Sequence, residues 1–149
     1  MNKFAVYDKF IIAIKKRLQN NSDIIFPPKV FETFLGEIES FDVDKKYLII
    51  KFPVLNKYMN PYNTLQGGVL TAMIDNTIGP LSMMIDLPSF TRQLNVKYIK
   101  PVPKGCYYIL IKAKFIEKRK NFLFFDAIVE DNNGNKVATA SVSHWIMKS

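Results

Sequence analysis

The pattern of apolar and polar residues divides the chain into helix-like and strand-like stretches. Within residues 1–20, apolar side chains recur at helical spacing and lysines fill the opposite side, which predicts an amphipathic helix from Lys3 to Leu18. The apolar members are Phe10, Ile11, Ile14 and Leu18. Such a helix either caps the domain or lays its basic face on a membrane surface, and the sequence leaves both interpretations open.

A second helical pattern occupies the middle of the chain. Between Tyr58 and Ile85 the single charged side chain is Asp75. Apolar residues recur at helical spacing from Gly67 to about Ile85, and a helix that is apolar around most of its circumference is a buried one. Pro80 should bend or shorten this helix, because proline cannot donate the hydrogen bond to the preceding turn.

Six further stretches have the composition of strands. They are residues 34–42, 47–52, 91–98, 106–117, 122–130 and 136–147. Asn133-Gly134 between the last two is a strong hairpin signal. The fold class predicted is α+β: a long central helix wrapped by a curved antiparallel sheet of about five or six strands, with an extra N-terminal helix. The free edges of such a sheet can be satisfied by pairing in a dimer.

Composition narrows the class of protein. The 149 residues fit one domain, 1–149, and the lone cysteine, Cys106, excludes an intramolecular disulfide and suits a reducing cytoplasm. Neither a signal peptide nor a membrane-spanning stretch is predicted, so we expect a cytoplasmic protein without stable membrane insertion. The net charge of +8 is spread along the chain without a nucleic-acid-binding motif. A small polyphosphate ligand such as coenzyme A suits the same electrostatics.

Asp75 is the most informative residue. A carboxylate within an apolar helix loses hydration, at a cost of several kcal/mol unless it is paired. Two interpretations remain: a structural hydrogen bond to a neighbouring loop, or a general base or nucleophile. The residues at helical spacing around it are small, namely Gly68, Thr71, Ala72, Gly79 and Ser82. Such a stripe lets a second backbone or a thin ligand approach closely.

The helix start is the second candidate feature. Gly67 and Gly68 leave backbone N–H groups uncovered at the positive end of the helix dipole, where a developing oxyanion could be stabilised. Asp75 lies roughly 12 Å further along an ideal helix axis. One atom could not contact both sites, so the ligand must lie along the helix or a second chain must complete the site.

Residues 60–79 read N-x5-Q-GG-x6-D-N-x2-G, and residues 91–101 read TRQLNVKYIKP. Together with the strand at 136–140, these motifs resemble the hotdog-fold thioesterases of the PaaI type, the phenylacetate-degradation family. The resemblance covers about residues 34–147, which would form the hotdog core.

The resemblance implies an acyl-CoA thioesterase that cleaves a fatty or aromatic acyl-CoA, working as a homodimer or dimer of dimers with active sites at the interface. Asp75 would activate water or attack the thioester carbonyl, and the Gly67 N–H would polarise that carbonyl. Asn60 would help to place the water or substrate. Thr91, from the partner strand, would lie near the water.

The resemblance also implies a set of substrate-binding residues. Gly68 and Asn76 would line the substrate site. Lys118, Arg119 and Lys120, with Lys100 or Lys104, would meet the coenzyme A phosphates, although ordinary solvated turns would look the same in the sequence. We expect no metal, and no cofactor apart from the coenzyme A of the substrate.

Two residues complicate this prediction. Gln66 stands where the family usually has histidine before Gly-Gly, and glutamine forms hydrogen bonds but cannot titrate. A non-catalytic acyl-CoA- or lipid-binding hotdog protein is therefore the alternative. His144, the single histidine, lies in the last predicted strand, where we expect a satisfied or exposed side chain without a catalytic role. Its position argues against a hotdog dehydratase.

Overall fold

The computed structural model describes residues 2–18, 24–85 and 88–147. Six strands form one antiparallel sheet in the order β1-β2-β4-β5-β6-β3. Their bounds are Glu37–Asp42 (β1), Tyr47–Pro53 (β2), Ser89–Tyr98 (β3), Tyr108–Arg119 (β4), Phe122–Asp131 (β5) and Lys136–Ile146 (β6). The helices are Lys3–Arg17 (α1), Lys29–Thr33 (α2) and Gly67–Ile85 (α3), with a 3-10 turn at Asn56–Tyr58 (η1).

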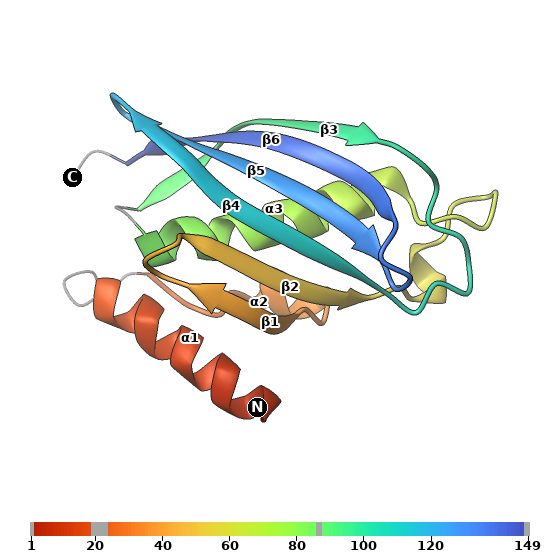
Figure 1. The fold of residues 1–149 in the computed structure, drawn as a ribbon, viewed down its shortest axis with the longest axis horizontal. Helices are drawn as coiled ribbons and strands as arrows, with labels where there is room; N and C mark the ends of the chain where they lie inside the picture. The colour runs from red at the N-terminus through yellow and green to blue at the C-terminus, as the bar shows by residue number, and fades with distance from the viewer. Residues whose placement is uncertain (1, 19–23, 86–87, 148–149) are drawn as a thin grey trace.

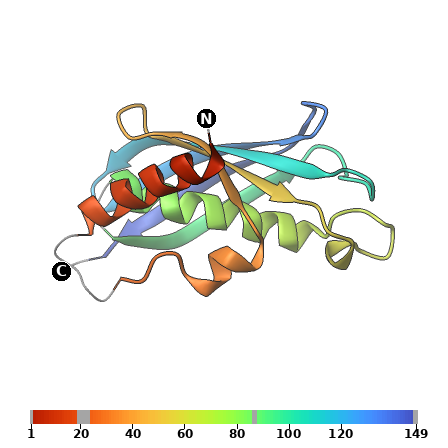
Figure 2. The ribbon, with the colours of Figure 1, turned by 90° about the horizontal axis from the view of Figure 1, so that it is seen from below.

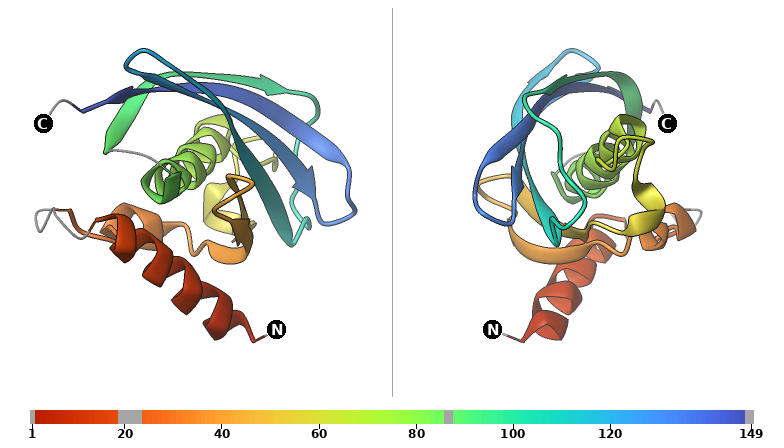
Figure 3. Two further views of the ribbon diagram at one scale, coloured as in Figure 1. Left: turned by 60° about the vertical axis from the view of Figure 1, so that its left-hand side comes forward. Right: turned by 90° about the vertical axis from the view of Figure 1, so that its right-hand side faces the viewer.

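The sheet curves around α3, which lies along its inner face (Figures 1 and 3). The side of α3 that faces the strands carries fully buried side chains such as Met73, Ile74, Ile78 and Leu81. They meet the inward-pointing residues of the strands, whose burial alternates along β4 and β5. The predicted arrangement of a central helix wrapped by a curved six-stranded sheet is therefore confirmed.

Helix α1 belongs to this core. It packs against β1 and α3, beside the β1 edge of the sheet (Figure 2). Phe10 and Ile14 are fully buried, and the Phe10 ring meets that of Phe41 edge-on with the centroids 5.3 Å apart. The apolar side of α1 therefore caps the domain, as one of the two interpretations predicted. None of the described helices is long and apolar enough to cross a membrane.

The structure departs from the predictions at Pro80 and at the start of β1. Helix α3 is not shortened at Pro80 and continues to the predicted end at Ile85, because the buried residues beyond the proline hold the last turns against the core. Strand β1 begins at Glu37 rather than Phe34, since the residues before Phe34 form the short helix α2. Gly36 is needed at this junction, because a Cβ atom there would lie 2.7 Å from the Phe52 ring.

Candidate active site

Asp75 lies on the side of α3 that the sheet leaves open. Its side chain is half-buried, so the prediction that it is enclosed by apolar helix packing is wrong for the single chain. Gly68 and Gly79 on the same side have open space where a Cβ atom would stand. The stripe of small residues therefore keeps this side of the helix accessible to a ligand or a second chain.

Thr91 comes from β3 and points at the carboxylate. Its hydroxyl donates a hydrogen bond to Asp75 Oδ1 at 2.7 Å. The β3–β6 register shifts just after Thr91, between Thr91 and Gln93, which marks a β-bulge at the start of the strand. The structure thus brings together two predicted residues that are sixteen positions apart, and it does so within one chain.

His144 lies directly behind Thr91, and the sequence prediction gave it no role. It pairs with Thr91 across β6 and β3, is only 2% exposed, and places Nε2 3.3 Å from Thr91 Oγ1. Its Nδ1 lies 3.0 Å from Ser89 Oγ. Burial lowers the pKa of His144 to about 4, although the nearby Asp75 carboxylate acts in the opposite direction. The pairing of β6 with β3 brings this histidine to the site, and the sequence alone does not reveal that pairing.

A cleft of about 300 Å³ opens at this cluster. Its polar lining includes Asp75, Asn76, Thr91 and His144. Its apolar lining comes from the segment around α2, from the end of α3 and from β3, and includes Phe26, Val30, Phe31, Met83 and Phe90. A carboxylate at the rim of an apolar cleft suits a reaction at a polarised carbon, such as a carbonyl carbon, whose attached apolar group binds in the cleft.

The start of α3 forms the other part of the candidate site. The first N–H groups of a helix have no partner within it, which leaves those of Gly67 and Gly68 directed outward. The Tyr98 hydroxyl donates to Gly67 O at 2.7 Å and lies 2.5 Å from Thr71 Oγ1. Tyr98 therefore fixes the helix start against β3, and a Cβ atom on Gly67 would stand 3.3 Å from its ring.

Residues 62–138 match the family model of the thioesterase superfamily, which is more than half of the chain. The chain belongs to the thioesterase superfamily. No curated protein matches the sequence.

Solved structures confirm that this thioesterase-superfamily chain has the hotdog fold. The structure of smu.793 from Streptococcus mutans UA159, bound to acetyl-CoA, is 20% identical, with a TM-score of 0.71 over 87% of this chain and 96% of that one. The phenylacetic acid degradation-related protein of Ralstonia eutropha JMP134 is 21% identical, with a TM-score of 0.74 over 90% and 99%. The E. coli PaaI protein is 14% identical, with a TM-score of 0.75 over 92% and 97%.

The two asparagines predicted for the thioesterase site make local hydrogen bonds. Asn60 Oδ1 accepts from the backbone N–H groups of Tyr62 and Thr64, and its Nδ2 donates to Thr64 Oγ1 at 2.8 Å. Asn60 thereby shapes the loop that leads into α3. Asn76 donates to Ala72 O at 2.7 Å and lines the cleft beside Asp75. Their roles toward water or substrate stay predictions.

The basic residues predicted to meet coenzyme A fall into two groups. Lys118 and Arg119 end β4 and Lys120 begins the turn to β5, so the three form one Lys118–Lys120 segment, in which Arg119 pairs with Glu117. Strand pairing places Lys118 in one row with Leu123, His144 and Thr91, so its backbone lies about 14 Å from that of Thr91 at ordinary strand spacing.

Lys100 lies at the other end of the sheet, 3.9 Å from Asp131 at the end of β5. Lys104 lies in the loop before β4, where its N–H donates to Asn63 O. One chain of this thioesterase-superfamily protein therefore does not gather all five cations at a single place. The described residues hold no cluster of three metal-ligating side chains.

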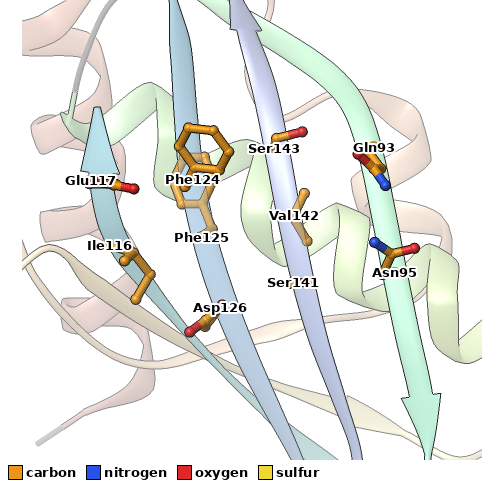
Figure 4. A pocket seen from close by; sticks show the side chains of 10 residues that line it. All are labelled: Gln93, Asn95, Ile116, Glu117, Phe124, Phe125, Asp126, Ser141, Val142 and Ser143. Atoms are coloured by element: carbon orange, nitrogen blue, oxygen red, sulfur yellow. The ribbon is translucent and has the colours of Figure 1, made fainter. Parts of the chain in front are cut away.

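A separate polar hollow lies on the outer face of the sheet, away from α3 (Figure 4). It has a volume of about 290 Å³ and its polar lining includes Gln93, Asn95, Asp126 and Ser141. Ser143 also faces it, with a buried hydroxyl that has no hydrogen-bond partner. Asp75 and Thr91 do not line this hollow, so it is distinct from the cleft on the helix side.

Proposed function

We propose that this protein hydrolyses the thioester bond of a fatty or aromatic acyl-CoA. The observation that carries the proposal is the Asp75 carboxylate, which Thr91 holds at the rim of an apolar cleft. Membership of the thioesterase superfamily supports this reaction class over other uses of a carboxylate.

The chemistry requires a nucleophile and a place for negative charge. With one oxygen bound by Thr91, the other Asp75 oxygen can take a proton from water as the water attacks the acyl carbon. Alternatively it can attack that carbon itself, and water must then hydrolyse the resulting acyl–Asp75 anhydride to release the acid and restore the carboxylate. In both routes the carbon–sulfur bond breaks after the attack on the acyl carbon, and the thiolate leaves and is protonated. A carbonyl oxygen beside the Gly67 N–H would be stabilised by the helix dipole as its charge develops, and one such donor typically contributes about 10²–10³ in rate.

Relatives support the same residues and ligand. A hypothetical thioesterase protein of Streptococcus pneumoniae TIGR4 was solved with coenzyme A. That protein was also solved with alanine in place of an aspartate and in place of a threonine. Those two positions are sixteen residues apart, as are Asp75 and Thr91. This equal spacing supports Asp75 as the reacting carboxylate. Separately, the proposal has the coenzyme A phosphates lie near the basic Lys118–Lys120 segment.

A second copy of the chain would complete the site. The Gly67 N–H and Asp75 are about two helical turns apart, so a single acyl carbonyl cannot contact both on one helix. Strand β3 is an edge of the sheet, and pairing it with another β3 would bring a second α3 alongside the first. In such a homodimer the Gly67 N–H of one chain would act with Asp75 of the other.

The test is release of free coenzyme A from a panel of short, long and aromatic acyl-CoAs. We expect Asp75→Asn to lower kcat by at least about a hundredfold and Thr91→Val by about tenfold, in the range of lost acid–base or orienting groups. Asp126→Asn is the matched control, because it removes an exposed carboxylate on the outer face. Unchanged turnover in Asp75→Asn would refute the proposal.

The glutamine at position 66 favours a second candidate function, in which the protein binds an acyl-CoA or lipid without catalysis. Its side chain is exposed at the start of α3 and cannot carry a proton to or from a substrate. Tight binding of a non-hydrolysable acyl-CoA analogue without turnover of any acyl-CoA would support this candidate. It would be further supported if Gln66→His produced turnover.

A further inference from the structure

The hydrogen-bond chain behind Asp75 has a defined direction. Thr91 has one hydroxyl proton, and the 2.7 Å contact gives that proton to the Asp75 carboxylate, which can only accept when ionised. Toward His144 the Thr91 oxygen must then accept, so the proton of that 3.3 Å contact belongs to Nε2. A neutral imidazole with its proton on Nε2 has a lone pair on Nδ1. The Ser89 hydroxyl, 3.0 Å away, is placed to donate to it.

We propose that His144, held as the Nε2–H tautomer by Ser89, is a positioning residue that fixes the Thr91 hydroxyl on Asp75. The proposal rests on the thioesterase function proposed above and extends it to two residues, His144 and Ser89. His144 acts through Thr91 and does not itself touch the reacting atoms.

The surroundings of His144 keep its imidazole neutral. On the sheet it is paired with Leu123 of β5 and Thr91 of β3, and the Phe125 ring meets it edge-on with the centroids 5.2 Å apart. Asp75 of α3 is the charged group that acts on it, and it favours the protonated form. Burial outweighs this effect, since the pKa of His144 is lowered to about 4. Near neutral pH the imidazole therefore donates one hydrogen bond without adding a positive charge beside Asp75.

This arrangement has a consequence for the carboxylate. Without the Nε2–H donor, the Thr91 hydroxyl could turn and donate elsewhere, and the Asp75 carboxylate could rotate about its last torsion. With the donor present, the Thr91 hydroxyl keeps its bond to Oδ1 and the carboxylate keeps one orientation. A well-packed core histidine with no such role would support the fold but would not couple to Thr91.

Nuclear magnetic resonance tests the tautomer without any need for activity. Because the chain contains one histidine, ¹⁵N-labelled imidazole signals belong to His144 alone. We expect a protonated Nε2 and an unprotonated Nδ1 between pH 6 and 8. Ser89→Ala should weaken this preference, and Ser143→Ala, next to His144 but on the outer face, should leave it unchanged. A protonated Nδ1 or an imidazolium ion in the unaltered protein would overturn the proposal.

Kinetics test the positioning role. We expect His144→Leu to lower kcat for the preferred acyl-CoA by about tenfold with little change in KM, as expected for lost orientation of a reacting group. His144→Gln should recover most of the rate, because a glutamine amide can donate to Thr91. In a Thr91→Val background, His144→Leu should have no further effect. Equal losses with and without Thr91 would overturn the coupling.

The outcomes separate the two proposals. If no acyl-CoA is hydrolysed, the proposed function fails, while the tautomer measurement still decides the direction of the hydrogen-bond chain. If the enzyme is active and His144→Leu retains full kcat, the positioning role fails and the thioesterase function stands. Should His144→Leu not fold, Ser89→Ala and His144→Gln carry the same comparison, and full kcat in Ser89→Ala together with an unchanged tautomer would overturn the role assigned to Ser89.

Discussion

Hydrogen bonds from a few side chains determine the orientation of the Asp75 carboxylate. Thr91 binds one of its oxygens, and His144 and Ser89 bind in turn behind Thr91. These contacts join α3 to the bulged start of β3 and to the end of β6, so the cluster exists only when the sheet is formed around the helix. The titration of His144 consequently affects folding as well as the candidate site.

We predict that acid weakens the fold through His144. In the unfolded chain the imidazole binds a proton below about pH 6.5, whereas the folded protein resists protonation down to about pH 4. The free energy of unfolding is therefore unaffected above pH 6.5 and falls as the pH drops from 6.5 toward 4, by up to about 3 kcal/mol at 1.36 kcal/mol per pKa unit. Urea unfolding at pH 7.0, 5.5 and 4.5 measures the decrease. His144→Gln, which cannot titrate, should show a smaller one, and equal decreases in both proteins would contradict the prediction.

The two glycines at the start of α3 should differ in their tolerance of alanine. A methyl group on Gly67 would press on the Tyr98 ring at 3.3 Å, whereas one on Gly68 would meet nothing within 4 Å. We expect Gly67→Ala to displace Tyr98 from Gly67 O and Thr71, with a loss of about 1 kcal/mol per hydrogen bond. Gly68→Ala should be neutral or slightly stabilising, because alanine is the better helix former. Thermal unfolding compares the two, and the same melting temperature for both would show that Tyr98 moves without cost.

Burial of apolar faces, rather than the helix propensity of single residues, determines how the helices pack. Helix α3 continues through Pro80 because residues on both sides of it are buried against the sheet. Helix α1 lies beside the β1 edge and closes that side of the core, so the N-terminal segment contributes to the stability of the whole domain.

Substitution on the two sides of α1 tests this packing. Phe10 is fully buried, so Phe10→Ala should lower the free energy of unfolding by about 3–5 kcal/mol. Ile12, on the same helix, is 65% exposed, and Ile12→Ala should change it by about 0.5 kcal/mol or less. Chemical unfolding monitored by circular dichroism measures both. Similar values for the two variants would mean that α1 is not docked in solution.

At the scale of the whole molecule, the net charge bears on substrate attraction and the free edge of the sheet bears on self-association. The chain carries a net charge of +8, and Lys118, near the end of β4, lies in the strand row that also contains Thr91. A polyanionic substrate should therefore be attracted to this end of the sheet. The edge strand β3 is where we expect a second copy to pair, and light scattering combined with size-exclusion chromatography measures the resulting mass.

Salt should weaken the use of acyl-CoA and spare a substrate without phosphates. We expect KM for acyl-CoA to rise by about fivefold or more between low and high ionic strength, because exposed charges are screened within a Debye length. The same acyl group on pantetheine should show little salt dependence. Replacing Lys118, Arg119 and Lys120 by glutamine should reduce the difference between the two substrates. An equal salt response for both would exclude phosphate contacts as its cause.

The sequence by itself determined the elements and their faces. Helical periodicity set α3 to begin at Gly67 and end near Ile85, because burial of one face leaves a periodic trace in the chain. Strand-like composition between turn residues marked the six strands. The Asn60–Gly79 motif also singled out Asp75 and the glycines of the helix start. Local helices of three to five residues, α2 and η1, left no such trace and were missed.

Only the tertiary structure decided which residues share the site. The contact of His144 with Thr91 depends on β6 lying beside β3, a pairing between segments about fifty positions apart that no local pattern encodes. The exposure of Asp75 was likewise decided by which side of α3 the sheet covers, because a helix that is apolar almost all round does not specify its buried side. The periodicity of the sequence shows that a residue is buried, whereas tertiary packing determines which residues it contacts.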